Sequence, residues 1–458
     1  MNVKDFVFKK VELWVTLTIF LLTLGGGVLL AFGFGTLVRQ ELIGTTKFGE
    51  ISRLALEIAE IPSRVKSALK GKTIPNTQLN RQSDFVGTPA SEESYLLLSR
   101  HDDRRGQSIL ELVDLTTFEV RHTWSPDFDS LFDQINPDER DFRFLWRDKN
   151  FRQNLNHPIL LDDLSIAFQS HTPLFFIDLH SRLKVVEQSD IYHHSIERDH
   201  QNNLWVPVQL CPTSFGREQV GPSCSFVARE FVDDGIAKLS ADGKLLWTKS
   251  VIQILDQNQL GHLIFGAAPP LSRDPVHLND IQPVLSDGPF WRKGDVFLSL
   301  RNLSMVVLYR PSSNEVVKVI QGGFSHQHDI EIISPTRISV FDNNHKNYLG
   351  QKEMEYSGIV IFDFSDNAFE RYHQGSFDAF RIRNATGGKA TIAPDGGFFV
   401  QDHENATYYY FDPDGAIRWD YVSRTASGDQ INALFWSRIL TSQKDIELVR
   451  LILERREH

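Results

Sequence analysis

The sequence predicts an all-β protein, a six-bladed β-propeller that follows an N-terminal transmembrane helix and a short helical stalk. Three observations lead to this fold class. Strand–turn–strand units recur six times, helical periodicity is confined to the two ends of the chain, and one uncharged apolar run precedes everything else. With 458 residues, of which 41% are hydrophobic, the chain is long enough to bury a large core.

The uncharged run comes first. Residues 13–38, LWVTLTIFLLTLGGGVLLAFGFGTLV, contain no charged side chain and exceed the roughly 20 residues that a helix needs to cross a bilayer. A cleavable signal peptide has a shorter apolar core and a small-residue cleavage site, and no convincing site follows here. A buried helix of a soluble domain is the other alternative. We expect residues 13–38 to form an uncleaved transmembrane signal anchor.

The charges beside this run favour one orientation only slightly. Lysines precede it within residues 1–12, and Arg39 and Lys47 follow it at similar range. Because Lys and Arg concentrate on the cytoplasmic side of membrane helices, we expect residues 1–12 to be cytoplasmic. The protein would then be a single-pass protein of the inner (cell) membrane, with its C-terminal domain extracytoplasmic, in the periplasm of a Gram-negative cell.

Residues 39–85 are predicted to form a helical stalk and a linker. Within them, residues 48–71 place apolar side chains at helical spacing, with Pro62 as a break or kink, and the polar stretch KTIPNTQLNRQSD follows. Beyond this linker the helical signal nearly disappears until the amphipathic C-terminal helix.

The region 86–458 carries the repeats that predict the propeller. Turn pairs such as Asp242-Gly243 and Asp414-Gly415 form strong hairpins because they accept positive φ. The units recur at roughly 50 to 70 residues, near the spacing of four-stranded blades. A β-sandwich with an extra domain is the alternative, but it does not explain the repetition. The six units are LVDLTTFEVRHTW, FFIDLHSRLKVVEQ, IAKLSADGKLLWTK, VVLYRPSSNEVVKVI, IVIFDFSDNAFERY and YYYFDPDGAIRWDY.

The two cysteines of the chain, Cys211 and Cys224, enclose the segment PTSFGREQVGPS. Its Gly and Pro residues predict a loop, and an oxidising compartment permits a disulfide across it. Two unpaired thiols are the alternative, while a zinc site would need more ligands nearby.

The formal net charge of −11 argues against nucleic-acid binding, which needs clustered positive charge. No long basic tract is present, so attachment to a membrane surface through Lys and Arg is not expected either. The sequence also holds no glycine-rich phosphate cradle of the P-loop type.

Histidines lie near several predicted strand starts. In GGFSHQHDIEIISPTRISVFDNN, His326 and His328 are two residues apart, and side chains at i and i+2 of a strand point the same way. Propeller sites lie on the central axis, where residues distant in sequence meet, and His194, His277 and Arg301 are suited to meet them there. Two same-side histidines also suit a metal site, although no third or fourth ligand is identified. Structural hydrogen bonds, or a structural salt bridge for Arg301, are the remaining alternatives.

The block HLNDIQPV…GDVFLSLRNLSMVVLYRPSSNEVVKVIQGGFSHQHDIEIISPTRISVFDNN resembles the 3′-phosphoadenosine-independent arylsulfotransferase (aryl sulfate sulfotransferase) family. The shared features are a His-x-Asn before a Gly-Asp strand, a strand ending in Arg-x-x-Ser, a Gly-Gly, a Gln-His-Asp and an FDN strand. The segments HHSIERDHQNNLWV and ATGGKATIAPDGGFFVQDHENATYYYFDPDGAIRWDYV resemble an earlier histidine segment and the last blade of the family. The resemblance covers about residues 178–436, and it implies a six-bladed propeller.

The resemblance also implies transfer of a sulfuryl group from an aryl sulfate ester to a phenolic acceptor through a sulfated histidine. His328 matches the position of the nucleophile, and His194, His277 and Arg301 match the supporting groups. A neutral imidazole nitrogen can attack sulfur and hold the group covalently, which splits the transfer into two easier steps. Arg and His can hydrogen-bond the sulfate oxygens, while a His can protonate the departing phenolate.

Beside these catalytic candidates, Asn279 and His326 are the candidate substrate-binding residues. The resemblance implies no cofactor and no metal. The expected partners are an aryl sulfate donor, a phenolic acceptor and the membrane, with a membrane-protein partner or a homo-oligomer as further options. The main alternative function is a non-catalytic propeller that serves as a scaffold or partner-binding subunit of a cell-envelope complex. A quinoprotein-like or metal-dependent propeller oxidoreductase is a weaker third alternative.

Overall fold

The long apolar helix and the strands belong to two compact units, and each is described by itself. The computed structural model describes residues 13–42, Ile51, Leu54, Ala55, Ile58, Ala59, 85–102, 104–135, 155–169, 173–210, 232–266, 274–345, 355–425 and 434–456. The predicted cytoplasmic segment 1–12, most of the predicted stalk and linker 39–85, and both Cys211 and Cys224 lie outside these residues.

The helix α2 (Leu13–Leu42) contains the predicted anchor. Its segment Trp14–Arg39 has a mean hydropathy of 2.2, and its most apolar stretch is not buried against other parts of the protein. The hydroxyls of Thr18, Thr23 and Thr36 each donate to the carbonyl four residues earlier, so these polar groups are satisfied within the helix. By length and composition, α2 is a candidate membrane span.

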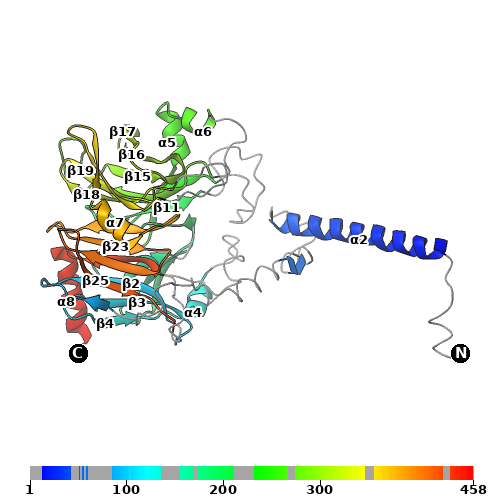
Figure 1. Ribbon diagram of the computed structural model, residues 1–458, viewed down its shortest axis with the longest axis horizontal. Helices are drawn as coiled ribbons and strands as arrows, with labels where there is room; N and C mark the ends of the chain where they lie inside the picture. Colours follow the sequence, from blue (N-terminus) through cyan, green and yellow to red (C-terminus); the bar gives the residue numbers. More distant parts are fainter. Residues whose placement is uncertain are drawn as a thin grey trace. The chain divides into compact units, whose positions relative to one another are not determined.

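The described strands form six antiparallel sheets, four with four strands and two with five, and this confirms the predicted six-bladed propeller (Figure 1). We number the blades 1 to 6. Blade 1 consists of β26 (Leu434–Leu440), β2 (Tyr95–Asp102), β3 (Gln107–Asp114) and β4 (Glu119–Trp124), and blade 2 of β5 (Asn156–Leu160), β6 (Ile166–Gln169), β7 (Leu174–Ile177) and β8 (Leu183–Glu187). Blade 3 consists of β9 (Ile191–Tyr192), β10 (Glu197–Arg198), β11 (Leu204–Gln209), β12 (Asp234–Leu239) and β13 (Leu245–Ser250).

The remaining blades follow the same pattern. Blade 4 consists of β14 (Leu278–Pro283), β15 (Val296–Leu300), β16 (Met305–Arg310) and β17 (Glu315–Gln321), and blade 5 of β18 (His328–Ser334), β19 (Arg337–Asp342), β20 (Gly358–Asp363) and β21 (Ala368–Tyr372). Blade 6 consists of β22 (Lys389–Ile392), β23 (Phe398–Asp402), β24 (Thr407–Phe411), β25 (Ile417–Val422) and β1 (Phe85–Gly87).

Each of the six predicted repeats is a hairpin of the third and fourth strands of a blade. The pairs are β3–β4, β7–β8, β12–β13, β16–β17, β20–β21 and β24–β25. The turn residue Gly243 has φ +84°, and a Cβ there would come within 2.8 Å of the Phe176 ring in blade 2. A tight turn and a close approach between blades both require glycine at this position.

The ring closes through both ends of the domain. The C-terminal strand β26 is the inner strand of blade 1, while the N-terminal β1 pairs with β25 at the outer edge of blade 6. Between these blades, Leu96 and Leu98 of β2 are buried against Phe399 and Tyr408 of blade 6. Burial of such side chains contributes roughly 1.5–3 kcal/mol each, so closure is driven by a hydrophobic seam.

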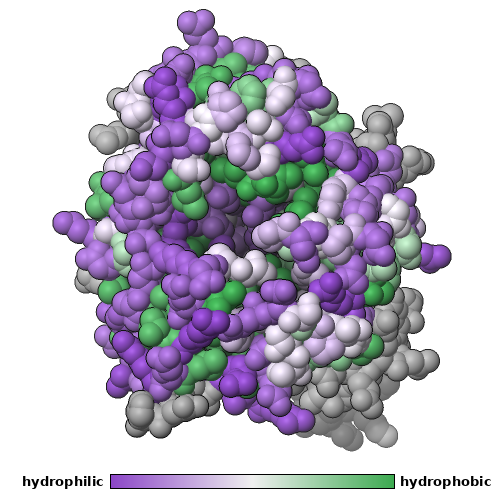
Figure 2. Space-filling model, turned by 90° about the vertical axis from the view of Figure 1, so that its left-hand side faces the viewer, coloured by the Kyte–Doolittle hydropathy of each residue, from purple (hydrophilic) through white to green (hydrophobic). Residues whose placement is uncertain are grey.

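Polar bonds also join neighbouring inner strands. The Asp280 carboxylate of β14 accepts from the Ile330 N–H of β18 at 2.6 Å, and the Asp329 carboxylate of β18 accepts from the Ala390 N–H of β22 at 2.9 Å. Each bond satisfies a buried backbone group. The inner strands are therefore fixed to one another around the axis, and the face shown in Figure 2 is hollowed at its centre.

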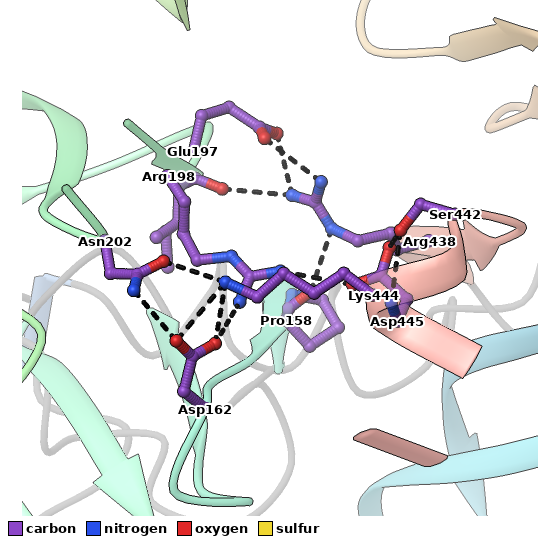
Figure 3. Close-up of polar contacts among 10 residues, drawn as sticks. Pro158, Asp162, Glu197, Arg198, Asn202, Arg438, Ser442, Lys444 and Asp445 are labelled. Carbon is purple, nitrogen blue, oxygen red and sulfur yellow. Dashed lines mark hydrogen bonds and ion pairs between the residues drawn. The ribbon is translucent and has the colours of Figure 1, made fainter. Parts of the chain in front are cut away.

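The predicted C-terminal helix is α8 (Gln443–Arg456), whose buried Val449 and Ile452 join the core of blades 1 and 2. Figure 3 shows the polar contacts at its start, where Lys444 and Asp445 contact Asp162 of blade 2 and Arg198 of blade 3. The other described helices are α4 (Phe128–Phe132), α5 (Val251–Gln257), α6 (His262–Phe265), α7 (Gln374–Phe380) and the 3₁₀ turn η2 (Arg301–Leu303).

Candidate active site

The site lies at the end of the propeller where the inner strands begin. Four histidines near these strand starts, in four successive blades or just before them, have left-handed backbone conformations, with φ of +48° at His157, +57° at His194, +51° at His277 and +55° at His326. Residues other than glycine adopt this conformation at a cost of roughly 1–3 kcal/mol, and they concentrate at functional sites. Holding these four backbones in the left-handed region therefore lowers the stability of the fold, and it sets the direction in which each histidine side chain leaves the backbone.

Irregular strand pairing accompanies the same histidines. The register shifts between residues 156 and 159 of β5, 278 and 280 of β14, and 328 and 330 of β18. In blade 3 the inner edge is interrupted between β9 and β10. Bulges re-aim side chains, so the interruptions bring the histidines out of the regular alternation of a strand.

His328 is the first residue of β18, and only 3% of it is exposed. Its Nδ1 lies 2.7 Å from Oδ1 of Asn343. The amide nitrogen of Asn343 donates to the carbonyls of Asn384 at 3.0 Å and Gly387 at 2.7 Å, which fixes the amide orientation. Because the amide oxygen is an acceptor only, Nδ1 of His328 must carry the proton. The lone pair of the neutral ring is then on Nε2.

The environment of His328 keeps the ring neutral. Burial lowers its pKa to about 3, against the opposing effect of the Asn343 hydrogen bond, and the charges of Arg301 and His277 lower it further. Near neutral pH the imidazole is therefore unprotonated at Nε2, as a nucleophile requires.

The rings of His194 and His277 pack edge to face, with centroids 5.1 Å apart and an interplanar angle of 76°. Nδ1 of His277 lies 2.5 Å from a carboxylate oxygen of Asp274. Burial raises the pKa of Asp274, but the hydrogen bond and charge of His277 together with the charge of His193 outweigh this effect, and the pKa is lowered. A carboxylate-oriented imidazole is suited to acid–base chemistry.

A second carboxylate supports His194 indirectly. Nδ1 of His194 lies 2.6 Å from Nδ1 of His193, whose Nε2 is 3.4 Å from Asp234. Asp234 also accepts from the Leu278 N–H at 2.7 Å, which ties blade 3 to blade 4. His193 therefore links a buried carboxylate to the site.

Arg301 supplies positive charge. It follows β15 directly, and its backbone N–H donates to the His277 carbonyl at 3.1 Å. Burial lowers the pKa of the guanidinium, and the charge of Asp274 counters this effect. The same guanidinium lowers the pKa of both His326 and His328. The charges of Arg301 and His277 therefore both act on the ring of His328.

His326 and His328 do not lie side by side on a strand, as the i, i+2 spacing suggested. His326 precedes β18, and its Nδ1 contacts the His345 carbonyl at 2.9 Å, so this nitrogen carries the proton. Burial lowers the pKa of His326, followed in importance by the charge of Arg301. The fully buried Asn279 donates to the Gln327 carbonyl at 2.8 Å and so fixes the backbone just before His328.

Sequence reasoning assigned no role to three residues of this site. Trp436 of β26 lies between the His157 ring, at 3.7 Å between centroids, and the His328 ring, at 5.7 Å. Asn343 belongs to the FDN motif and directly follows β19, but its orientation depends on the carbonyls of Asn384 and Gly387, in the segment that precedes β22. His157 precedes a proline in an ordinary apolar strand, and no sequence signal distinguishes it.

The profile of the family described as Arylsulfotransferase (ASST) matches residues 170–424, more than half of the chain. The chain belongs to the arylsulfotransferase family. A comparison with curated proteins finds no match.

Similar solved structures share little sequence with this arylsulfotransferase-family protein. One is a protein of unknown function from Bacteroides caccae, with 10% identity, a TM-score of 0.46, and coverage of 77% of this chain and 100% of that chain. Another is TolB from Acinetobacter baumannii, with 9% identity, a TM-score of 0.42, and coverage of 86% and 73%. A third is virginiamycin B lyase from Staphylococcus aureus, with 10% identity, a TM-score of 0.33, and coverage of 59% and 70%.

The arylsulfotransferase match includes His194, His277, Arg301 and His328, while His157 and Trp436 lie outside it. Within the described part of the chain, no group of three or more His, Cys, Asp or Glu side chains is arranged to hold a metal ion.

Proposed function

We propose that this protein transfers a sulfuryl group from an aryl sulfate ester to a phenolic acceptor through a sulfohistidine on His328. The observation that carries the proposal is the bond between His328 and Asn343. It places the lone pair on Nε2, while burial keeps the ring neutral. Family membership supplies the reaction class.

In the first half-reaction, Nε2 of His328 attacks the sulfur of the donor. The N–S bond forms and the bond between sulfur and the aryl oxygen breaks. The departing phenolate takes a proton from the imidazolium of His277, which Asp274 orients through Nδ1. His328 keeps its Nδ1 proton, which stays bonded to Asn343.

In the second half-reaction, the phenolic acceptor returns this proton to neutral His277. Its oxygen attacks the sulfur, the N–S bond breaks, and Nε2 of His328 regains its lone pair. The proton and the sulfuryl group are both conserved over the cycle, so the protein needs no external acid, base or cofactor.

The other site residues are assigned to positioning and charge. Arg301 binds the sulfate oxygens, because a half-buried guanidinium attracts an anion more strongly than an exposed one. His194 adds a second hydrogen-bonding group beside His277. His326, with its proton on Nδ1, presents Nε2 as an acceptor for a phenolic hydroxyl. Asn279 acts through the Gln327 carbonyl instead of touching substrate.

We also propose that α2 anchors the protein in the inner membrane with the propeller in the periplasm. The length and apolar surface of α2 support the anchor, and the slight Lys and Arg bias supports the orientation. Alkaline phosphatase fused after Leu42 would be active only if this side of α2 faces the periplasm, and an inactive fusion that is stably expressed would reverse the orientation.

The enzymatic test uses 4-nitrophenyl sulfate with an added phenol. We expect nitrophenol release that depends on the acceptor, is lost in His328→Ala and persists in His262→Ala, a change at an exposed histidine of α6. Without acceptor, the His328 peptide should gain the mass of one SO₃ group. Failure of release with every phenol of a broad panel would favour the non-catalytic scaffold.

A further inference from the structure

A cavity lies between blades 1 and 6. Its volume is about 730 Å³. Its lining extends from Arg100 near the end of β2, which pairs with Leu434 at the start of β26, to Phe118 in the turn between β3 and β4, at the opposite end of β3. None of the proposed catalytic residues lines it.

The lining has an excess of positive charge. Its described residues include four arginines, Arg100, Arg104, Arg105 and Arg424, and two carboxylates, those of Asp102 and Glu111. With His101 neutral, four positive charges and two negative charges leave these described residues with a net charge of +2.

The two carboxylates are already engaged. Arg100 donates to Glu111 through two bonds of 2.8 Å, and Arg105 contacts Asp102 at 2.6 Å. Arg104 is exposed and forms no ion pair with any residue that the structure describes. Arg424, in contrast, is only 8% exposed, so its guanidinium is part of the cavity wall.

Aromatic rings form another part of the wall. The rings of Phe85 and Phe118 are stacked, with centroids 4.8 Å apart and an interplanar angle of 8°, and Tyr421 lies 4.8 Å from Phe85. An aromatic ring of a ligand can stack on an aromatic side chain. A guanidinium group can donate two parallel hydrogen bonds to two oxygens of a sulfate or sulfonate.

From this combination of an arginine-rich wall and an aromatic wall, we propose that the cavity is an accessory binding site for small aromatic anions, such as aryl sulfates and aryl sulfonates. The site is separate from His328 and does not depend on sulfuryl transfer.

The test measures binding of benzenesulfonate, which cannot donate a sulfuryl group, to the full-length protein by titration calorimetry. All variants carry His328→Ala and Arg301→Ala, so that the proposed active site contributes little. We expect Arg104→Glu and Arg424→Gln to weaken binding roughly tenfold each. Arg292→Glu, an exposed control in blade 4, should leave binding unchanged.

The ligand series separates the sources of binding. Benzenesulfonate should bind more tightly than inorganic sulfate, which lacks the ring, and than phenol, which lacks the charge. Equal binding of sulfate and benzenesulfonate would reduce the cavity to a plain anion site and overturn the aromatic assignment. Unchanged affinity in both Arg104→Glu and Arg424→Gln would overturn the site itself, whatever the activity at His328.

Discussion

The amide of Asn343 and the imidazole of His328 form a hydrogen bond of 2.7 Å that determines which ring nitrogen is protonated. The amide cannot turn over without losing its bonds to the Asn384 and Gly387 carbonyls. The segment that leads from blade 5 into blade 6 thus fixes the tautomer of a histidine in blade 5.

Asn343→Leu removes the acceptor for the Nδ1 proton. The ring can then carry its proton on Nε2, and we expect kcat for sulfuryl transfer to fall by roughly 10² or more with little change in KM. Asn343→Asp keeps an acceptor and should restore part of the activity. Because a carboxylate stabilises the imidazolium, it should also shift the acidic limb of the kcat/KM profile to higher pH. Equal loss in both variants, without a pH shift, would argue for a purely structural role.

The low pKa of His328 predicts a stability change with pH. The folded pKa of about 3 lies below the unfolded value of roughly 6.5. Between these values the unfolded chain binds the extra proton, so this histidine lowers the free energy of unfolding as the pH falls. Urea unfolding at pH 7 and pH 5 measures this effect. The free energy of unfolding should fall less between these two pH values in His328→Ala than in the wild type. A loss of the same size in both would contradict the buried, neutral state.

The buried Asp280 should give the opposite dependence of stability on pH. Burial raises its pKa to about 7, with further contributions from the charges of Asp329 and Glu197. Since the unfolded pKa is roughly 4, the folded protein holds a proton that the unfolded chain has lost. Stability from this group therefore decreases as the pH rises from about 4 to about 7.

Asp280→Asn should remove this component, so its unfolding free energy should change less between pH 5 and pH 7.5 than that of the wild type. Glu315→Gln, at an exposed glutamate of β17, is the matched control and should behave as the wild type does. If Asp280→Asn follows the wild-type curve, the carboxyl is ionised in the folded state.

The contacts in Figure 3 predict a large stability effect at Glu197. Its carboxylate accepts from Arg438 at 2.7 and 3.1 Å, and both side chains are about one-fifth exposed. Glu197→Ala leaves a largely buried guanidinium without its carboxylate and should cost roughly 3 kcal/mol. Lys184→Ala, which breaks the exposed pair with Asp163, should cost under about 1 kcal/mol. The urea midpoints of the two variants measure these losses of stability. If Glu197→Ala costs no more than Lys184→Ala, Arg438 has found another partner.

The outer hairpins could be predicted from the sequence because their information is local. A turn such as Asp242-Gly243 and the apolar strands beside it identify a hairpin without reference to the rest of the chain. The inner strands are different. β18 begins only at His328 and its register shifts directly afterwards, so the spacing of His326 and His328 wrongly suggested that they share one side of a strand.

The family motif was enough to name the proposed catalytic residues. The contacts that support these residues could not be predicted from it. The role of Asn343 depends on an amide orientation set by carbonyls about forty residues further along the chain. His157 and Trp436 lie outside the motif and meet His328 only once the ring is closed. Such contacts follow from the three-dimensional arrangement alone.

The pairing of the C-terminal strand β26 with β2 in blade 1 has a consequence for biosynthesis. Blade 1 lacks its inner strand until β26, close to the C-terminus, has been made. During synthesis, one edge of β2 therefore stays unpaired until the strands of the five other blades have been made. Trp436 belongs to this same last strand, so a chain that ends before β26 lacks both the closed ring and the aromatic ring beside His328.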